Sequence, residues 1–250
     1  MKHFQAGGAV DIKADNSPVT QADIEADNYI SAALRKLTPN IPVISEEGDY
    51  DNMPHTSTYW LVDPLDGTRS FINGEKEFTV NIGLVVNNRA YMGVIYAPAL
   101  DALYYTGEDG KAYKVNCHPE RSEGSGEILR FAQNDKIHIK VAPAPSPAEG
   151  YRIIASKNHR NKLTEDYIKT LNVKEFLPAS SSYKFCLIAE GKADIYPRFG
   201  NTMQWDTAAG QAILEAAGGR VVCADGGEFL YKFNHLDVES LRNGHFVASN

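Results

Sequence analysis

The sequence has few cysteines. Its 250 residues contain three, Cys117, Cys186 and Cys223, and no two of them form a Cys-x-x-Cys pair. An odd number of separated cysteines argues against a disulfide framework and against a structural zinc site. We therefore expect three reduced thiols, as is usual in a cytoplasmic protein.

An excess of positive charge and a long apolar run are also missing. The net charge is −7, whereas proteins that bind nucleic-acid polymers or membrane surfaces are usually basic. No apolar stretch approaches the roughly 18–20 residues of a transmembrane helix, and the opening MKHFQAGGAVDIK has no signal-peptide core. We expect no nucleic-acid partner, no transmembrane segment and a cytoplasmic location, and leave peripheral attachment to the inner membrane open.

The 43% of hydrophobic residues suffices for a substantial core. A helix is expected to begin after Thr20, because Thr20 and Asp23 are spaced as in a capping box, and Pro39 stops it. Further helices are predicted at 161–171, 182–191 and 205–219, the last with Asp206 at its N-cap. Short apolar runs predict strands at 41–45, 59–63, 78–86, 90–97, 102–106, 111–115, 136–142, 151–156, 193–199, 219–222 and 245–249. This mixture indicates a layered α+β architecture.

One polar stretch, residues 116–135, separates two of the predicted strands. It contains His118, Glu120 and Glu123, which are residue types that ligate metals. An excursion at the tip of a hairpin accounts for the stretch better, since insertions collect at such tips. We therefore expect a deletion from Cys117 to Asp135 to leave a soluble, active protein.

Acidic residues follow two of the predicted strands directly. Glu46 and Glu47 come after IPVIS, and Asp63 and Asp66 come after YWLV, three residues apart. Like charges this close raise each other's pKa unless a cation lies between them. Strands that end together bring such residues to one edge of a sheet, and Mg²⁺ prefers carboxylate oxygens. Glu46, Asp63 and Asp66, with Asp206, are candidate metal ligands; a solvated Asx-Pro turn and a plain N-cap are the alternatives.

The residues after Asp66 suggest a site for phosphate. Gly67 permits a close approach of the backbone, and a helical turn that begins there would direct the N–H groups of Gly67 and Thr68 at an anion. Carboxylates for metal ions beside N–H groups for phosphate are the minimum needed for metal-assisted hydrolysis of a phosphate ester.

Several motifs resemble those of one enzyme superfamily. The segments SEE, WLVDPLDGTRSF and WDTAAGQAILEAAGG are similar to the signatures of the inositol monophosphatase superfamily of magnesium-dependent, lithium-sensitive phosphatases. Four other segments most resemble its bacterial 3′(2′),5′-bisphosphate nucleotidases: KADNSPVTQAD, EFTVNIGLV, SSYKFCLIAEGKADIYPRF and MQWDTAAG. Family members usually have a full helix before KADNSPVT, whereas twelve residues precede it here.

The resemblance implies the αβαβα sandwich of the inositol monophosphatase/fructose-1,6-bisphosphatase type. Residues 1–142 would carry the metal and phosphate site, and residues 143–250 the substrate-specificity residues and Asp206. The implied reaction is hydrolysis of the 3′-phosphate of adenosine 3′,5′-bisphosphate to AMP and phosphate, with the sulfated analogue as a further substrate. The alternatives are an inositol or sugar phosphate phosphatase and a catalytically inactive nucleotide-binding protein. The oligomeric state, monomer or homodimer, stays open.

The resemblance also assigns the metal and catalytic residues. Two or three Mg²⁺ ions would be bound by Glu46, Asp63, Asp66, Asp206 and the backbone carbonyl of Leu65. The pair Asp23 and Thr68 would orient and deprotonate the attacking water, although Asp23 also suits helix capping. The backbone at Gly67 and Thr68 would contact the reacting phosphate. Glu47, beside the metal ligands, would hold a water.

The substrate residues come from the second half of the chain. Ser181 and Lys184 match the family's Ser-Ser-x-Lys block, and Lys184 and Arg198 would hold the non-reacting 5′-phosphate. Ser156 and His159 match a substrate-lining strand end, and Asp206 would also face the substrate. From the residues alone, Lys184 is equally a solvated helix residue, and His159 equally an exposed histidine at a helix start.

Overall fold

The computed structural model describes residues 1, 3–4, 10–12, 18–48, 56–116, 136–146, 148–156, 160–234 and 238–250. His159 lies outside these residues, and so do residues 117–135, with all three possible metal ligands of the polar stretch.

A seven-stranded sheet is built from the first half of the chain, in the order β3-β4-β5-β6-β7-β8-β9. β3 and β4 run parallel, and every later pair is antiparallel. The strands are β3 (Val43–Ser45), β4 (Thr58–Asp66), β5 (Thr79–Val86), β6 (Arg89–Ala97), β7 (Ala102–Thr106), β8 (Ala112–Asn116) and β9 (Lys136–His138). Each coincides with a predicted strand, so the apolar runs located this sheet correctly.

β4 continues beyond its predicted end at Asp63 and stops at Asp66. Its register against β5 shifts between these two residues: Asp63 pairs with Asn81, and Asp66 pairs with Thr79. In a regular strand, residues three apart point to opposite faces of the sheet, and an irregularity re-aims them. The shift therefore lets both carboxylates face the same side.

A five-stranded sheet is built from the second half, in the order β11-β10-β12-β14-β13. Its strands are β10 (Tyr151–Ser156), β11 (Val173–Ala179), β12 (Ile195–Arg198), β13 (Arg220–Cys223) and β14 (Phe246–Ser249). β11 was not predicted, because its residues are mostly exposed at the sheet edge and show no alternation of apolar and polar types. Along the chain, all strands of the seven-stranded sheet precede residue 142 and all strands of the five-stranded sheet follow residue 143. The division of the chain into two halves, 1–142 and 143–250, stays a prediction.

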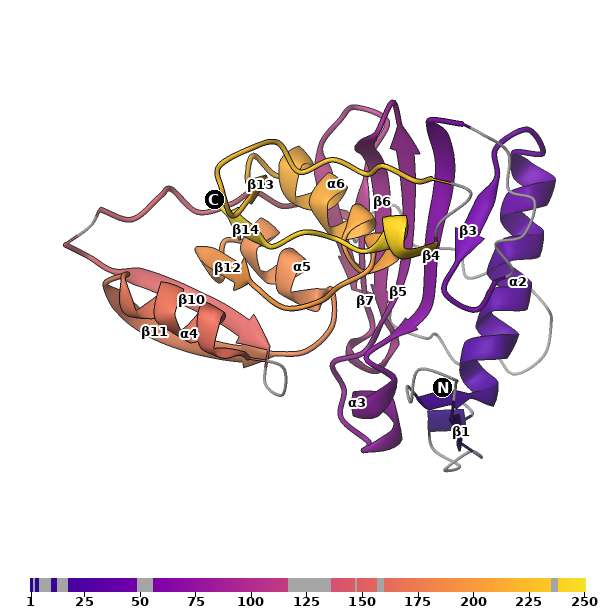
Figure 1. Cartoon of the computed structure of the whole chain (residues 1–250), viewed down its shortest axis with the longest axis horizontal. Helices are drawn as coiled ribbons and strands as arrows, with labels where there is room; N and C mark the ends of the chain where they lie inside the picture. Colours follow the sequence, from indigo (N-terminus) through magenta and orange to yellow (C-terminus); the bar gives the residue numbers. More distant parts are fainter. Residues whose placement is uncertain are drawn as a thin grey trace.

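Helices complete five layers, αβαβα, as the resemblance implied (Figure 1). α2 (Gln21–Leu37) covers the outer face of the seven-stranded sheet, α5 (Tyr183–Ala189) and α6 (Ala208–Ala216) lie between the sheets, and α4 (Lys162–Lys169) covers the five-stranded sheet. The main core is continuous across α5, α6 and both sheets. Smaller elements are the β1–β2 pair (Val10–Ile12, Pro18–Thr20), α3 (Thr68–Ile72), η1 (Pro98–Leu100) and η4 (Val238–Leu241).

Two glycines let α6 pack closely on the first sheet. Gly83 and Gly93 pair across β5 and β6. A Cβ at Gly93 would lie 2.3 Å from the carbonyl oxygen of Ala209, and a Cβ at Gly83 would lie 2.8 Å from its nitrogen. The backbone of α6 thus rests on side-chain-free backbone of the sheet, and this contact holds the segment that carries Asp206 against β4 and β5.

The helix starts show one confirmed prediction and one error. Thr20 caps α2, and Thr20 and Asp23 form the predicted capping box. Asp206 is not the N-cap of the last helix: it ends a 3₁₀ turn, η3 (Gln204–Asp206), and α6 begins after Thr207. The Asp206 carboxylate accepts a hydrogen bond from the Met203 N–H at 2.7 Å.

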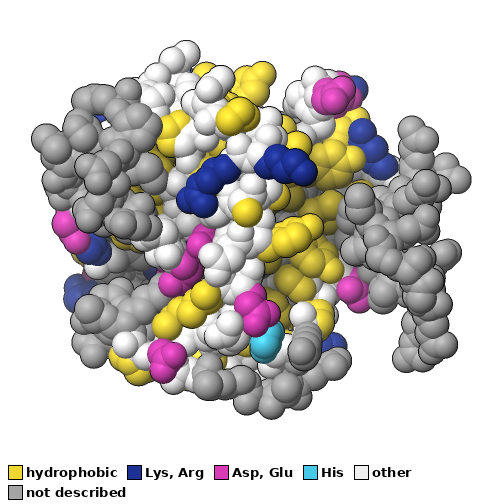
Figure 2. Space-filling view, turned by 90° about the vertical axis from the view of Figure 1, so that its right-hand side faces the viewer, with side chains coloured by type: hydrophobic (Ala, Val, Ile, Leu, Met, Phe, Trp, Pro, Cys, Tyr) yellow, Lys and Arg dark blue, Asp and Glu magenta, His cyan; other side chains and the backbone are white. Residues whose placement is uncertain are grey.

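The outer surface carries charges of both signs. On the α2 side, Lys and Arg side chains are separated by polar and apolar groups among the coloured residues, without a continuous basic stripe (Figure 2). Across the described part of the chain, no helix combines the length and apolar character needed to cross a membrane.

Candidate functional site

Glu46 and Asp63 come together because β3 and β4 are parallel neighbours. Ser45 at the end of β3 pairs with Val62, and the Glu46 N–H donates to the Val62 carbonyl at 3.0 Å. The predicted proximity of these two acids is therefore observed, although Asp63 lies within β4 and not at its end.

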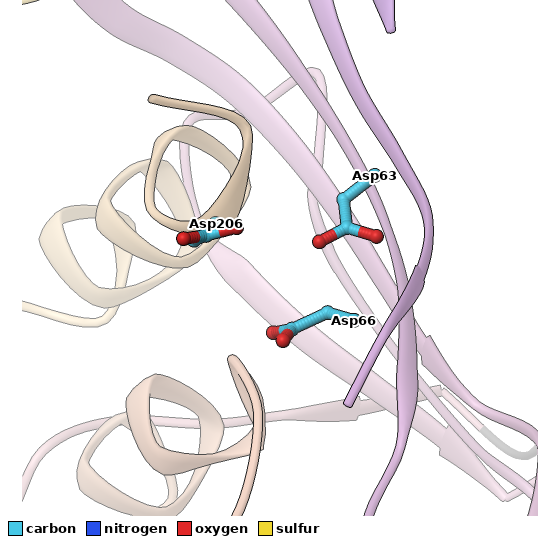
Figure 3. A group of neighbouring side chains, drawn as sticks. All are labelled: Asp63, Asp66 and Asp206. Atoms are coloured by element: carbon cyan, nitrogen blue, oxygen red, sulfur yellow. The ribbon is translucent and has the colours of Figure 1, made fainter. Parts of the chain in front are cut away.

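Three aspartates converge from two parts of the fold. Asp63 and Asp66 extend from β4, and Asp206 faces them from the turn before α6 (Figure 3). One carboxylate oxygen from each lies within 4.8 Å of the others. Glu46, Asp66 and Asp206 line one common cleft. Glu47 follows in the turn after β3 and is not among the described residues that line this cleft.

The electrostatics of the cluster call for positive charge. Burial raises the pKa of Asp63 well above its usual range, and the charges of Glu46, Asp66 and Asp206 raise it further. Burial and the charge of Asp66 raise the pKa of Asp206 to about 8. Mutually repelling carboxylates within reach of one atom provide the hard oxygen ligands that Mg²⁺ takes. The residues present fit a divalent cation.

The pair predicted from the resemblance, Asp23 and Thr68, does meet. The Thr68 hydroxyl lies 3.3 Å from Asp23 Oδ1 and 3.1 Å from the Leu65 carbonyl oxygen, and it donates to one of them at a time. Asp23 is 2% exposed and accepts the Thr20 N–H through its other oxygen at 2.8 Å. Asp23 therefore caps α2 and contacts Thr68 simultaneously, so its two proposed roles are compatible.

Gly67 joins β4 to α3, and a helical turn begins at Thr68 as predicted. The φ angle of Gly67 is +90°, in the left-handed region that strains other residues. A Cβ at this position would also lie 3.4 Å from the Glu77 carbonyl oxygen. Glycine is therefore required for the sharp turn between the acids and the start of α3.

A cleft of about 220 Å³ is lined by three acids, Glu46, Asp66 and Asp206, and by three cationic side chains. Its lining includes acids, cations, small residues and one tyrosine, namely Glu46, Asp66, Gly67, Thr68, Arg69, Ser156, Ser181, Ser182, Lys184, Tyr196, Arg198 and Asp206. Ser156, at the end of β10, and Ser181, with φ +52°, both line this cleft, and their contact with a substrate stays a prediction.

Lys184 is buried in the cleft, at 5% exposure, so the alternative of a solvated helix residue is wrong. Burial lowers its pKa to about 8, although the charge of Asp66 acts in the opposite direction. Its Nζ donates to the Ser181 carbonyl and lies 5.2 Å from the centre of the Tyr196 ring. Arg198 donates to the Asn201 carbonyl at 2.8 Å.

The sequence interpretation missed two polar residues beside the acids. Ser182 donates from its N–H to Asp66 at 2.6 Å, and Asn81 donates to Ser182 Oγ at 2.9 Å. Ser182 belongs to the recognised SSYK block but received no role. Asn81 had a usable signal, since it is the one polar amide in the apolar run TVNIGLVV.

The chain is similar to known proteins over most of its length. A sequence model described as the inositol monophosphatase family matches residues 1–248. The "3'(2'),5'-bisphosphate nucleotidase CysQ" of Buchnera aphidicola is 42% identical over 242 residues, which cover 96% of this chain and 83% of the relative. The protein of that name from Escherichia coli K12 is 43% identical over 84% of this chain and 77% of its own length. The crystal structure of CysQ from Bacteroides thetaiotaomicron gives a TM-score of 0.76 at 42% identity, over 95% of this chain and 86% of that one.

Proposed function

The chain belongs to the inositol monophosphatase family, and we propose that its cleft hydrolyses the 3′-phosphate of adenosine 3′,5′-bisphosphate to AMP and phosphate. The observation that carries this proposal is that two aspartates of the cluster, Asp66 and Asp206, line one cleft together with a buried lysine. The relatives that share 42–44% of their residues with this chain carry the corresponding nucleotidase name.

Mg²⁺ is the proposed cofactor, in two or three ions per site, held by Glu46, Asp63, Asp66, Asp206 and the Leu65 carbonyl. Bound Mg²⁺ would polarise the phosphate and make water acidic enough to ionise near neutral pH. Without cations, burial and the mutual repulsion of the acids together raise the pKa values of Asp63 and Asp206. Inhibition by lithium is expected from the family resemblance.

The chain's own groups then position water and phosphate. Asp23 accepts the Thr68 hydroxyl hydrogen, which leaves the lone pairs of that oxygen to accept a hydrogen from the attacking water. The backbone N–H groups of Gly67 and Thr68, at the start of α3, contact the reacting phosphate. Glu47, which is not among the described residues that line the cleft, is proposed to hold a water beside the metal ligands.

Lys184 and Arg198 are proposed to hold the 5′-phosphate, with Ser156 and Ser181 lining the nucleotide. Lys184 is largely desolvated before the substrate arrives, so its attraction for a phosphate is weakly screened. The sulfated analogue keeps the same 3′-phosphate and is expected to be a second substrate.

The test compares phosphate release from adenosine 3′,5′-bisphosphate, adenosine 3′-monophosphate, inositol 1-phosphate and fructose 1,6-bisphosphate, with and without Mg²⁺. Lys184→Ala and Arg198→Ala should each lower kcat/KM for the bisphosphate by about tenfold or more, the value of a charge-assisted hydrogen bond. Neither should affect the 3′-monophosphate, which lacks the group they bind. Lys162→Ala, at an exposed lysine that is paired with Asp166 on α4, is the matched control.

The outcomes separate the alternatives. If the protein prefers inositol phosphate or fructose bisphosphate, and if neither variant changes kcat/KM, the substrate is an inositol or sugar phosphate and not the nucleotide. No phosphate release from any substrate by folded protein would instead support an inactive nucleotide-binding protein.

A further inference from the structure

The Asp66 carboxylate is held by donors on one of its oxygens. The Ser182 N–H lies 2.6 Å from Asp66 Oδ2, the Ser182 hydroxyl 2.7 Å and the Asn81 Nδ2 3.4 Å. All three contacts end on Oδ2. Within the described residues, Asp66 Oδ1 has no hydrogen-bond donor, and this oxygen is therefore available to a cation.

The Ser182 hydroxyl also connects two candidate metal ligands. Its oxygen lies 2.6 Å from the backbone carbonyl of Asp206 as well as 2.7 Å from Asp66. A hydroxyl has one hydrogen, so it donates to one of these acceptors at a time, while its lone pair accepts the Asn81 N–H. Ser182 is 3% exposed, so water does not easily take over either contact.

Asn81 fixes the arrangement from the seven-stranded sheet. It lies on β5 opposite Asp63 and is 1% exposed. A carboxylate only accepts hydrogen bonds, so the NH₂ group of the Asn81 amide must face Asp66. The amide oxygen is then a buried acceptor without a hydrogen-bond donor among the described residues. A buried amide that leaves its oxygen unpaired is serving the contacts of its nitrogen.

We propose that Ser182 and Asn81 are a positioning pair that aims Asp66 Oδ1 at the cation and ties Asp66 to the segment carrying Asp206. The inference rests on the proposed function in that the cation is the Mg²⁺ of that site. Donors that hold one oxygen of a ligating carboxylate fix the direction of the other, and such supporting contacts are typically worth about 10–100-fold in metal affinity. Because Ser182 precedes α5, which carries Lys184, the pair also links the metal site to the proposed 5′-phosphate site.

The test measures Mg²⁺ binding directly by titration calorimetry, without substrate, for the wild type, Ser182→Ala, Asn81→Ala and the double variant. Each single variant should raise the Mg²⁺ dissociation constant about tenfold or more. The double variant should weaken binding little beyond either single variant, because both act through one hydrogen-bonded unit. Ser31→Ala removes another buried serine hydroxyl that donates to an aspartate, Asp27, on α2, and should leave Mg²⁺ binding unchanged.

Unfolding curves in EDTA identify variants that are merely unstable, and if Ser182→Ala does not fold, Asn81→Ala carries the test. Unchanged Mg²⁺ affinity in folded variants, or additive losses in the double variant, would overturn the positioning role. The two proposals fail separately. If the Mg²⁺ dissociation constants of the variants shift as expected but the wild type releases no phosphate, the positioning role stands and the proposed phosphatase activity fails. If the wild type is active but the variants bind Mg²⁺ as it does, the activity stands and the positioning role fails.

Discussion

Without divalent cations, the protein should lose stability as the pH rises from 5 to 8. The pKa of Asp206 is raised from 3.8 to about 8 in the folded state. Between these values the folded protein keeps a proton that the unfolded chain releases. The free energy of unfolding therefore falls with pH, by about 1.4 kcal/mol per unit for one proton. From pH 5 to 8 this amounts to about 4 kcal/mol, a large part of a typical total of about 5–15 kcal/mol.

Among the described residues, the other groups with shifted pKa values do not reverse this slope within that window. The raised pKa of Asp63 acts in the same direction. Glu190 and Asp194 have lowered pKa values, so their stabilising contributions are lost only as the pH falls below their usual values of 4.5 and 3.8. Lys184, whose pKa is lowered to about 8, changes its contribution only above pH 8.

The assay is urea unfolding at pH 5, 6, 7 and 8, in EDTA and in Mg²⁺, for the wild type and Asp206→Asn. The variant removes the charge but keeps an oxygen for the Met203 N–H. It should flatten the slope in EDTA and weaken the stabilisation by Mg²⁺. Equal slopes for the two proteins in EDTA would refute the reasoning, because they would show that Asp206 does not hold the extra proton.

Three further predictions concern packing, pH and the polar stretch. Gly93→Ala should lower the free energy of unfolding by about 1–3 kcal/mol in urea, because its Cβ meets the backbone of α6; an unchanged midpoint would contradict that close packing. The KM for the bisphosphate should rise above pH 8 as Lys184 loses its charge, and Lys184→Arg should remove that rise in a pH profile. Replacing residues 117–135 by Asn-Gly should keep phosphatase activity, because Val115 and Lys136 are already paired neighbours on β8 and β9; inactive or insoluble protein would count against it.

Much of the fold could be predicted because its elements have strong local signals. The capping box at Thr20 and Asp23 fixed the start of α2, and the apolar runs located every strand of the first sheet. The edge strand β11 escaped prediction because its stability comes from pairing with β10 and not from its own pattern. The layer order came from the family resemblance, since no local signal says that α6 lies between two sheets.

The site divides in the same way. The proximity of Glu46 and Asp63 follows from the parallel pairing of two apolar strands, in which the last residue of β3, Ser45, lies opposite Val62. The position of Asp206 beside them depends on tertiary packing, and so does the burial of Lys184, which its sequence neighbours do not indicate. The roles of all these residues, and of His159 outside the described residues, stay predictions.

The convergence of Asp63 and Asp66 with Asp206 has a mechanical consequence. The first two belong to the seven-stranded sheet, and Asp206 lies beyond most of the second sheet along the chain. A cation bound among them would close the long loop of chain between Asp66 and Asp206, as a reversible cross-link does. Its binding energy would add to the free energy of unfolding, so that cofactor loss would lower the resistance of the whole chain to unfolding and proteolysis.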